Sequence, residues 1–361
     1  MSTTISRRAV LAGSATAVAG LALAACSGGS SSSSSSSSST ASPSGTVTLV
    51  THDSFNLPKE IESQFQADTG CSLTVVTMGD GGELVNKLVL TKDAPQGDVV
   101  FGVDNSFASR VLSEGVIDTS QTVSLPEGSD QYLVDGQKAL APIDFGEVCL
   151  NYDVDWFDKK GLAAPTSFED LIKDDYKDLL VAINPSTSST GLAFLLATIG
   201  HFGEDGFADY WKKLVANGAK IDSGWTDAYE TDFSAGEGKG AYPIVVSYSS
   251  SPASTLSDDG KSSTTASVLS TATRQVEYAG VLAGAANPAG GKAFVEWMLS
   301  KKVQSAIPDS MYMYPVNPEA TLSEAMQKFG ATSDDPIVVE ADEITKNREA
   351  WLQTWTEAVG Q

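Results

Sequence analysis

The sequence has few of the residues and motifs that carry catalytic or metal chemistry. Among 361 residues there are two histidines and three cysteines, too few for a zinc cluster. No GxSxG, HExxH or GxxxxGK[ST] motif occurs, so the signatures of common hydrolases, zinc proteases and P-loop proteins are missing. Basic residues number 23 against 46 acidic ones, which argues against a nucleic-acid-binding protein with its basic surface stripe.

The first 26 residues are predicted to be an export signal. Arg7-Arg8 precedes an Ala/Val/Leu/Gly run over 9–25, which is short for a membrane-spanning helix and typical of a signal peptide. Paired arginines favour twin-arginine export. The run ends in Leu23-Ala24-Ala25-Cys26, which resembles the lipobox of bacterial lipoproteins. We expect Cys26 to be acylated; the alternative is a plain signal anchor with an incidental cysteine.

Residues 27–45 are predicted to be a flexible tether, because ten consecutive serines (30–39) have no apolar face to bury. The whole chain is 41% hydrophobic, and the part after the tether is long enough for about two domains. Cys71 and Cys149 lie in apolar, strand-like runs. They could form a disulfide in an exported protein or remain buried thiols, and the sequence leaves both open.

After the tether, strand-like and helix-like patterns alternate, which predicts an α/β fold with a mostly parallel sheet. The first three predicted strands each run into an acidic residue, Asp53, Asp80 or Asp104. Ligands of open α/β sheets bind at the carboxyl ends of the strands, so these acids are candidates for ligand contact; the alternative is a role as helix N-caps. The strands are expected at 46–51, 72–77 and 98–102.

Two further patterns occur in the second half of the chain. A Ser/Thr-rich turn over 184–191 enters a helix, so Thr187 and Ser188 could cradle an anion or simply cap that helix. Trp225 and Tyr312 lie in predicted loops, where they could stack on a flat cation or pack between lobes as core residues.

Together these segments resemble the thiamine-binding substrate-binding proteins of ABC importers, from about residue 46 to the end. The motifs that carry the resemblance are His52-Asp53-Ser54-Phe55, Gly79-Asp80-Gly81, Pro142-Ile143-Asp144-Phe145-Gly146, the turn 185–191, Gly224-Trp225-Thr226-Asp227-Ala228-Tyr229, the segment 246–253 and Met313-Tyr314-Pro315.

The resemblance implies a two-lobed, type II periplasmic-binding-protein-like α/β fold with two crossovers and an interlobe cleft that closes by a hinge. Lobe 1 would comprise 46–145 and 275–361, and lobe 2 would comprise 146–274. It also implies a monomeric receptor, not an enzyme and without a cofactor. The receptor would capture thiamine or a thiamine phosphate and deliver it to a membrane ABC permease. With Cys26 acylated, it would be anchored at the outer face of the cytoplasmic membrane.

The resemblance also assigns site residues. Trp225, Tyr248 and Tyr312 fall on aromatic cleft positions, Asp80 on an acidic contact, and His52 where the family often has Tyr. Thr187 and Ser188 fall on the loop that would meet a phosphate tail. An aromatic expected after Pro252-Ala253 is replaced by Ser254. The full predicted set is His52, Asp53, Asp80, Gly81, Asp104, Thr187, Ser188, Trp225, Tyr229, Tyr248, Ser251 and Tyr312.

Other ligands and one other class stay open. A receptor of the same fold could bind a polyamine, a ferric ion or an oxyanion. Iron sites of related proteins use adjacent tyrosines, whereas Ser249 follows Tyr248 here. An exported hydrolase using Ser188 with His52 or His201 is a remote alternative, which no motif spacing supports.

Overall fold

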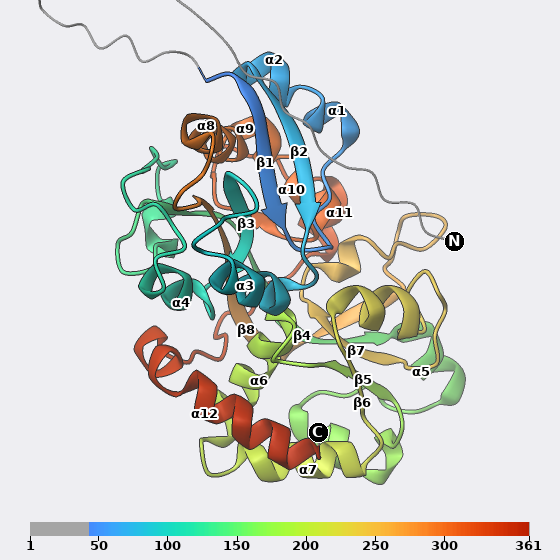
Figure 1. Ribbon diagram of the computed structural model, residues 1–361. Coiled ribbons are helices and arrows are strands. Elements are labelled where there is room, and N and C mark those ends of the chain that lie inside the picture. The colour runs from blue at the N-terminus through green and yellow to red at the C-terminus, as the bar shows by residue number, and fades with distance from the viewer. Residues whose placement is uncertain (1–42, 361) are drawn as a thin grey trace, which may run out of the picture. The chain divides into compact units, whose positions relative to one another are not determined.

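One mixed sheet runs through the part of the chain that the computed structural model describes, residues 43–360 (Figure 1). Its nine strands there follow the order β2-β1-β3-β8-β4-β7-β5-β6, with β9 paired to β4. The strands are β1 (Gly45–Thr51), β2 (Cys71–Thr77), β3 (Val99–Asp104), β4 (Leu140–Asp153), β5 (Leu180–Ile183), β6 (Lys220–Asp222), β7 (Ile244–Tyr248), β8 (Thr265–Val281) and β9 (Tyr314–Pro315).

The sheet joins two parallel groups through two long antiparallel strands. β1 pairs in parallel with β2 and β3, and β5 pairs in parallel with β6 and β7. Between these groups lie β4 and β8, of 14 and 17 residues, which pair with each other over most of their length. β3 pairs with the end of β8, and β7 pairs with the end of β4. The two long strands therefore connect the halves of the molecule.

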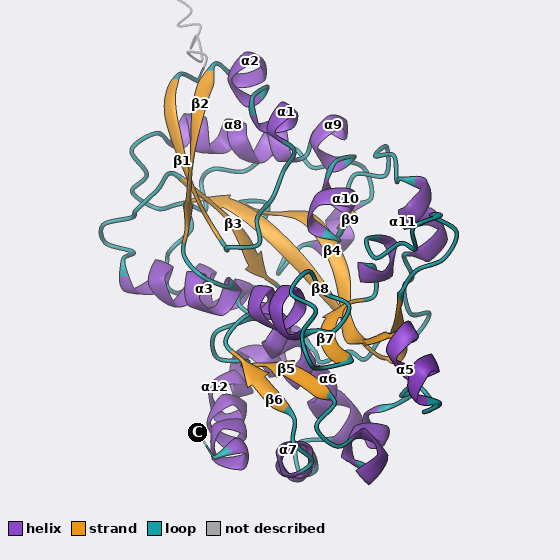
Figure 2. Cartoon of the chain, turned by 90° about the vertical axis from the view of Figure 1, so that its right-hand side faces the viewer, coloured by secondary structure: helices purple, strands orange, loops and turns teal. Residues whose placement is uncertain are grey.

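Helices surround this sheet (Figure 2). Helix α6 is buried from Ser189 to Ile199, as expected for a helix that is apolar nearly all round. Helix α3 instead buries one face through Leu84, Val85 and Leu88. The helices are α1 (Lys59–Glu62), α2 (Phe65–Thr69), α3 (Gly81–Leu90), α4 (Ala108–Ser113), α5 (Val154–Lys160), α6 (Ser189–Phe202), α7 (Phe207–Ala216), α8 (Pro288–Met298), α9 (Lys301–Gln304), α10 (Ile307–Met311), α11 (Glu324–Phe329) and α12 (Ala341–Val359).

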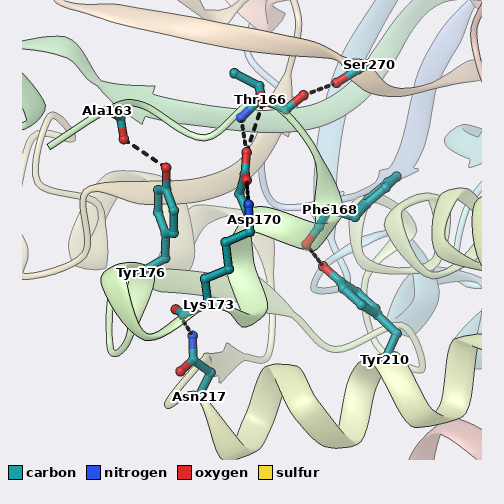
Figure 3. Close-up of polar contacts among 9 residues, drawn as sticks. All are labelled: Ala163, Thr166, Phe168, Asp170, Lys173, Tyr176, Tyr210, Asn217 and Ser270. Carbon is teal, nitrogen blue, oxygen red and sulfur yellow. Dashed lines mark hydrogen bonds and ion pairs between the residues drawn. The ribbon is translucent and has the colours of Figure 1, made fainter.

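The stretch between α5 and β5 is held mainly by side-chain hydrogen bonds (Figure 3). Asp170 accepts from the backbone N–H of Thr166 at 2.7 Å and from Nζ of Lys173 at 2.6 Å. Burial raises the pKa of Asp170, but these bonds outweigh it and lower the pKa to about 2. Tyr210 of α7 donates its hydroxyl to the carbonyl of Phe168 at 3.2 Å, which ties the stretch to the helical layer.

The predicted α/β class is confirmed, and the first three predicted strands are β1, β2 and β3. The expectation of a mostly parallel sheet is wrong, because the long strands β4 and β8 pair antiparallel with each other and with β7 and β3. Cys71 and Cys149 are buried free thiols, so that alternative is confirmed. The lobe boundaries stay a prediction. Helix α12, placed in lobe 1, packs on α7 of the 146–274 segment, where Trp355 meets Trp211 edge to face at 5.7 Å.

The predicted export signal with Cys26 and the serine run lie outside the described residues. Within residues 43–360, no helix has both the length and the apolar character needed to cross a bilayer.

Candidate ligand-binding site

A cavity of about 380 Å³ lies where the end of β1 faces segments from the second half and from α10. Its lining comprises residues 52–56, Trp225, Thr226, Glu230, Tyr248, Glu277 and residues 310–313. Five of the twelve predicted site residues therefore meet in one cavity: His52, Asp53, Trp225, Tyr248 and Tyr312.

One wall of the cavity is aromatic. Trp225 stacks on Tyr229 with ring centroids 4.9 Å apart and planes at 12°. Its Nε1 donates to Oγ of Ser247 at 3.0 Å, which fixes the ring. Tyr312 and Tyr248 stand 5.8 Å and 6.3 Å from Trp225. The indole is buried yet lines the cavity, so packing in the core and facing a ligand are compatible for this residue.

Tyr312 is held in a left-handed backbone conformation, with φ of 60°, as the residue that ends α10. A non-glycine residue in this region costs about 1 kcal/mol or more, and such residues cluster at functional sites. Oγ of Ser250 donates to the Tyr312 carbonyl and helps to hold this geometry. The local strain places the phenol beside Trp225 and Tyr229.

The charged side chains that line the cavity are acidic. Asp53, Glu230 and Glu277 line it, and no lysine or arginine does so among the described residues. Burial raises the pKa of Asp53 and of Glu230. Partial burial disfavours the charged form of these carboxylates, and a cation that enters the cavity would favour it.

Asp80 lies behind the aromatic wall and serves as the N-cap of α3. Its carboxylate accepts from the backbone N–H of Gly81 at 2.5 Å, Ser189 at 3.2 Å and Trp225 at 2.8 Å. Burial raises the pKa of Asp80, and the bonds from Trp225 and Gly81 partly offset that rise. The carboxylate thus joins the starts of α3 and α6 to the loop that carries Trp225.

Other predicted residues surround this junction without lining the cavity. A Cβ on Gly81 would lie 2.6 Å from Oγ of Ser189, so only glycine allows α3 and α6 to approach this closely. Thr187 donates to the Ser223 carbonyl at 2.6 Å. Ser188 is the N-cap of α6, and its Oγ accepts from Gly191 N–H at 3.2 Å.

Ser251 and Tyr229 lie on the far side of the aromatic wall. Oγ of Ser251 hydrogen-bonds Oγ of Ser247 at 2.9 Å, and Tyr229 is covered by the Trp225 ring. Ligand contact by the predicted residues outside the cavity stays a prediction; these are Asp80, Gly81, Asp104, Thr187, Ser188, Tyr229 and Ser251.

His52 is positioned by a bulge in β3. The pairing of β3 with β8 shifts register between Phe101 and Val103, and Gly102 there has φ of +97°. A Cβ on Gly102 would lie 2.0 Å from Cδ2 of His52, so the imidazole occupies the space that a side chain would need. Nδ1 of His52 hydrogen-bonds Oγ of Ser54 at 2.9 Å.

Sequence reasoning missed Glu277 and Glu230. Glu277 lies within β8 between Val276 and Tyr278, and the available signal was that it is the one acid in this strand. Nε2 of His52 lies 3.4 Å from Oε1 of Glu277. Glu230 follows Tyr229 in one irregular helical turn, η4 (Asp227–Asp232), and no pattern singles it out.

Comparison with known proteins places this arrangement in a family. The model of the family described as "Bacterial extracellular solute-binding protein" matches residues 95–336. The thiamine-binding periplasmic protein of Escherichia coli (strain K12) is 28% identical over 87% of this chain and 94% of that protein. The thiamine-binding periplasmic protein of Brucella suis biovar 1 is 26% identical over 89% and 94%.

Solved structures confirm the predicted periplasmic-binding-protein-like fold. A structure of a periplasmic thiamin binding protein matches with a TM-score of 0.75 at 27% identity, over 88% of this chain and 96% of that one. The apo ferric ion-binding protein A of Pasteurella haemolytica shares the fold with a TM-score of 0.64 at 18% identity, over 87% and 97%. The family model covers more than half of the chain, and this chain therefore belongs to the bacterial extracellular solute-binding proteins.

Proposed function

We propose that this protein captures thiamine, or a thiamine phosphate, outside the cytoplasm and delivers it to an ABC importer. The observation that carries the proposal is the composition of the cavity: aromatic side chains and three acids line it, and none of its described lining residues is Lys or Arg. The relatives in E. coli and Brucella are thiamine-binding periplasmic proteins, which supports the same ligand.

Thiamine matches such a site chemically. Its thiazolium ring carries a permanent positive charge, and both of its rings are flat. A cation over the face of Trp225 or Tyr312 gains about 0.5–2 kcal/mol for each contact that excludes water. The carboxylates of Asp53 and Glu230 at the cavity wall supply counter-charge. A polyamine would gain from the acids but would leave the stacking surface unused.

Isothermal titration of the purified protein with thiamine tests the proposal. We expect saturable binding at micromolar thiamine or below. Thiamine should bind more tightly than spermidine or ferric citrate and should displace both from the site. No heat at micromolar thiamine would contradict the vitamin assignment. The ligand recovered from the denatured complex should be chemically unchanged, because we propose a carrier and not an enzyme.

We also propose that the receptor is a monomer held at the outer face of the cytoplasmic membrane by a lipid on Cys26. The support is the sequence of residues 1–26, with Arg7-Arg8 before an apolar run that ends in Leu-Ala-Ala-Cys. Cys26→Ser should move the exported protein from the membrane fraction to the soluble fraction. Ser35→Ala in the serine run is the matched control and should stay with the membrane.

A further inference from the structure

Three acidic side chains stand side by side across the centre of the sheet. Glu277 of β8 is directly opposite Asp104 of β3 on one side and Asp144 of β4 on the other. We name Asp104, Glu277 and Asp144 the acid row. They are 0%, 5% and 0% exposed, and of the three only Glu277 lines the ligand cavity.

The groups facing the acid row supply little positive charge. His52, after β1, is the nearest titratable ring, and burial lowers its pKa to about 4, so it is neutral at pH 7. Asp80 at the start of α3 adds negative charge, and Tyr248 of β7 is neutral. The charge of Arg348 in α12 lowers the pKa of Asp104, although one N–H of its guanidinium group donates to the carbonyl of Ser106 at 3.2 Å.

The burial of the row and the few donors around it indicate that its carboxyl groups hold protons. Both Asp144 oxygens and Oδ2 of Asp104 are buried without a hydrogen-bond partner. Two carboxylates have only acceptors, and like charges directly opposite one another in a sheet destabilise it, so adjacent buried acids share protons. In agreement, burial and then the charge of Asp104 raise the pKa of Glu277 to about 8, although a hydrogen bond with Asp144 lowers it, and burial raises the pKa of Asp104 to about 7.

We propose that Glu277 is a specificity-determining residue that exchanges its proton for the permanent positive charge of the ligand. This inference rests on the function proposed above. In the empty site Glu277 is a neutral acid beside Asp104 and Asp144. A fixed cation in the cavity favours the carboxylate, so the O–H bond breaks, the proton leaves to solvent, and an ion pair replaces it. A neutral ring of the same shape gains nothing from this exchange.

Proton release can be counted directly. Thiamine is titrated into the purified full-length protein at about pH 7 in phosphate and in Tris, whose ionisation enthalpies differ widely. We expect about one proton released per thiamine, and an affinity that rises by up to about tenfold per pH unit below the pKa of the row. Glu277→Gln should bring the release close to zero and flatten the pH dependence.

Glu230→Gln is the matched control, because it removes a carboxylate from the same cavity that lies outside the acid row. It should weaken binding while leaving the proton count unchanged. Asp104→Asn is a second test that keeps Glu277 itself. The charge of Asp104 raises the pKa of Glu277, so without it Glu277 ionises more readily and fewer protons are released at the same pH.

The outcomes separate this inference from the proposed function. Thiamine binding with equal heats in both buffers and a flat pH profile would overturn the inference and leave the receptor function standing. Equal proton release by wild type and by Glu277→Gln would do the same. If Glu277→Gln does not fold, equal proton release by wild type and by Asp104→Asn would overturn the inference instead. No thiamine binding under any condition would overturn both.

Discussion

Asp80 and Glu277 are both buried acids near the same cavity, yet their surroundings are opposite. Asp80 accepts from three backbone N–H groups, from Gly81, Ser189 and Trp225. Glu277 has acids across from it on both neighbouring strands and only the neutral His52 ring beside it. A carboxylate that accepts hydrogen bonds from several backbone N–H groups stabilises the fold, whereas one that is surrounded by other acids gains from a cationic ligand.

The largest effect that the comparison predicts is the loss of stability in Asp80→Ala. Three N–H groups would lose their acceptor, and the start of α3 would lose its cap. We expect the free energy of unfolding to fall by about 3 kcal/mol in urea denaturation without ligand. Asp53→Ala at the exposed rim is the control and should change it by less than about 0.5 kcal/mol. Equal losses of unfolding free energy in the two variants would contradict a structural role that is specific to Asp80.

The second prediction concerns the wall that Asp80 holds in place. Trp225→Ala removes the main stacking surface and should weaken thiamine binding more than about tenfold in calorimetric titration. Trp351→Ala in α12 is the matched control: this tryptophan is similarly buried but lies outside the cavity lining. Both variants should lose stability, and only the first should lose affinity. A comparable affinity loss in Trp351→Ala would show that the effect of Trp225 is global.

The third prediction uses the pH dependence of stability. Glu277 has a pKa of about 8 in the folded protein against the ordinary 4.5, so between these values the folded state holds a proton that the unfolded state has released. The stability of the ligand-free protein should therefore fall as pH rises from about 5 to 8. Glu277→Gln should make this fall shallower and gain about 2 kcal/mol over wild type at the upper pH, while Asp104, with a pKa raised to about 7, still contributes to it. Parallel pH–stability curves, measured in urea, would contradict the proton on Glu277.

The smallest effect is expected at Thr187. Its hydroxyl already donates to the Ser223 carbonyl, and the residue does not line the cavity. Thr187→Val should cost about 1 kcal/mol of stability or less and change thiamine affinity by less than about twofold. A larger loss of affinity for thiamine monophosphate than for thiamine would instead support the predicted contact with a phosphate tail.

The positions of the strand-end acids could be predicted from the sequence, because a β-rich run followed by an acid is a local pattern. Asp53 and Asp80 do follow β1 and β2, and Asp104 is the last residue of β3. Their different environments could not be predicted. How many N–H groups reach Asp80 depends on where α6 and the Trp225 loop begin, and both come from distant parts of the chain.

Glu277 escaped prediction for a related reason. Its importance depends on the register of β8 against β3 and β4, which places three acids in one line. Sequence patterns show that a segment is a strand but do not show which residues of remote strands stand opposite one another. The aromatic residues were easier to find, because the sequence predicts loops around Trp225 and Tyr312, where a large ring is conspicuous, although Trp225 in fact begins the helical turn that leads into η4.

The bulge at Gly102 couples two positions that a designer would otherwise vary separately. Because the His52 ring fills the space above Gly102, exchange of that glycine for any larger residue would push the ring into the cavity and reshape it. A library aimed at new ligands should therefore randomise positions 52 and 102 together. In natural relatives, a bulky residue at the first position should be inherited with glycine at the second.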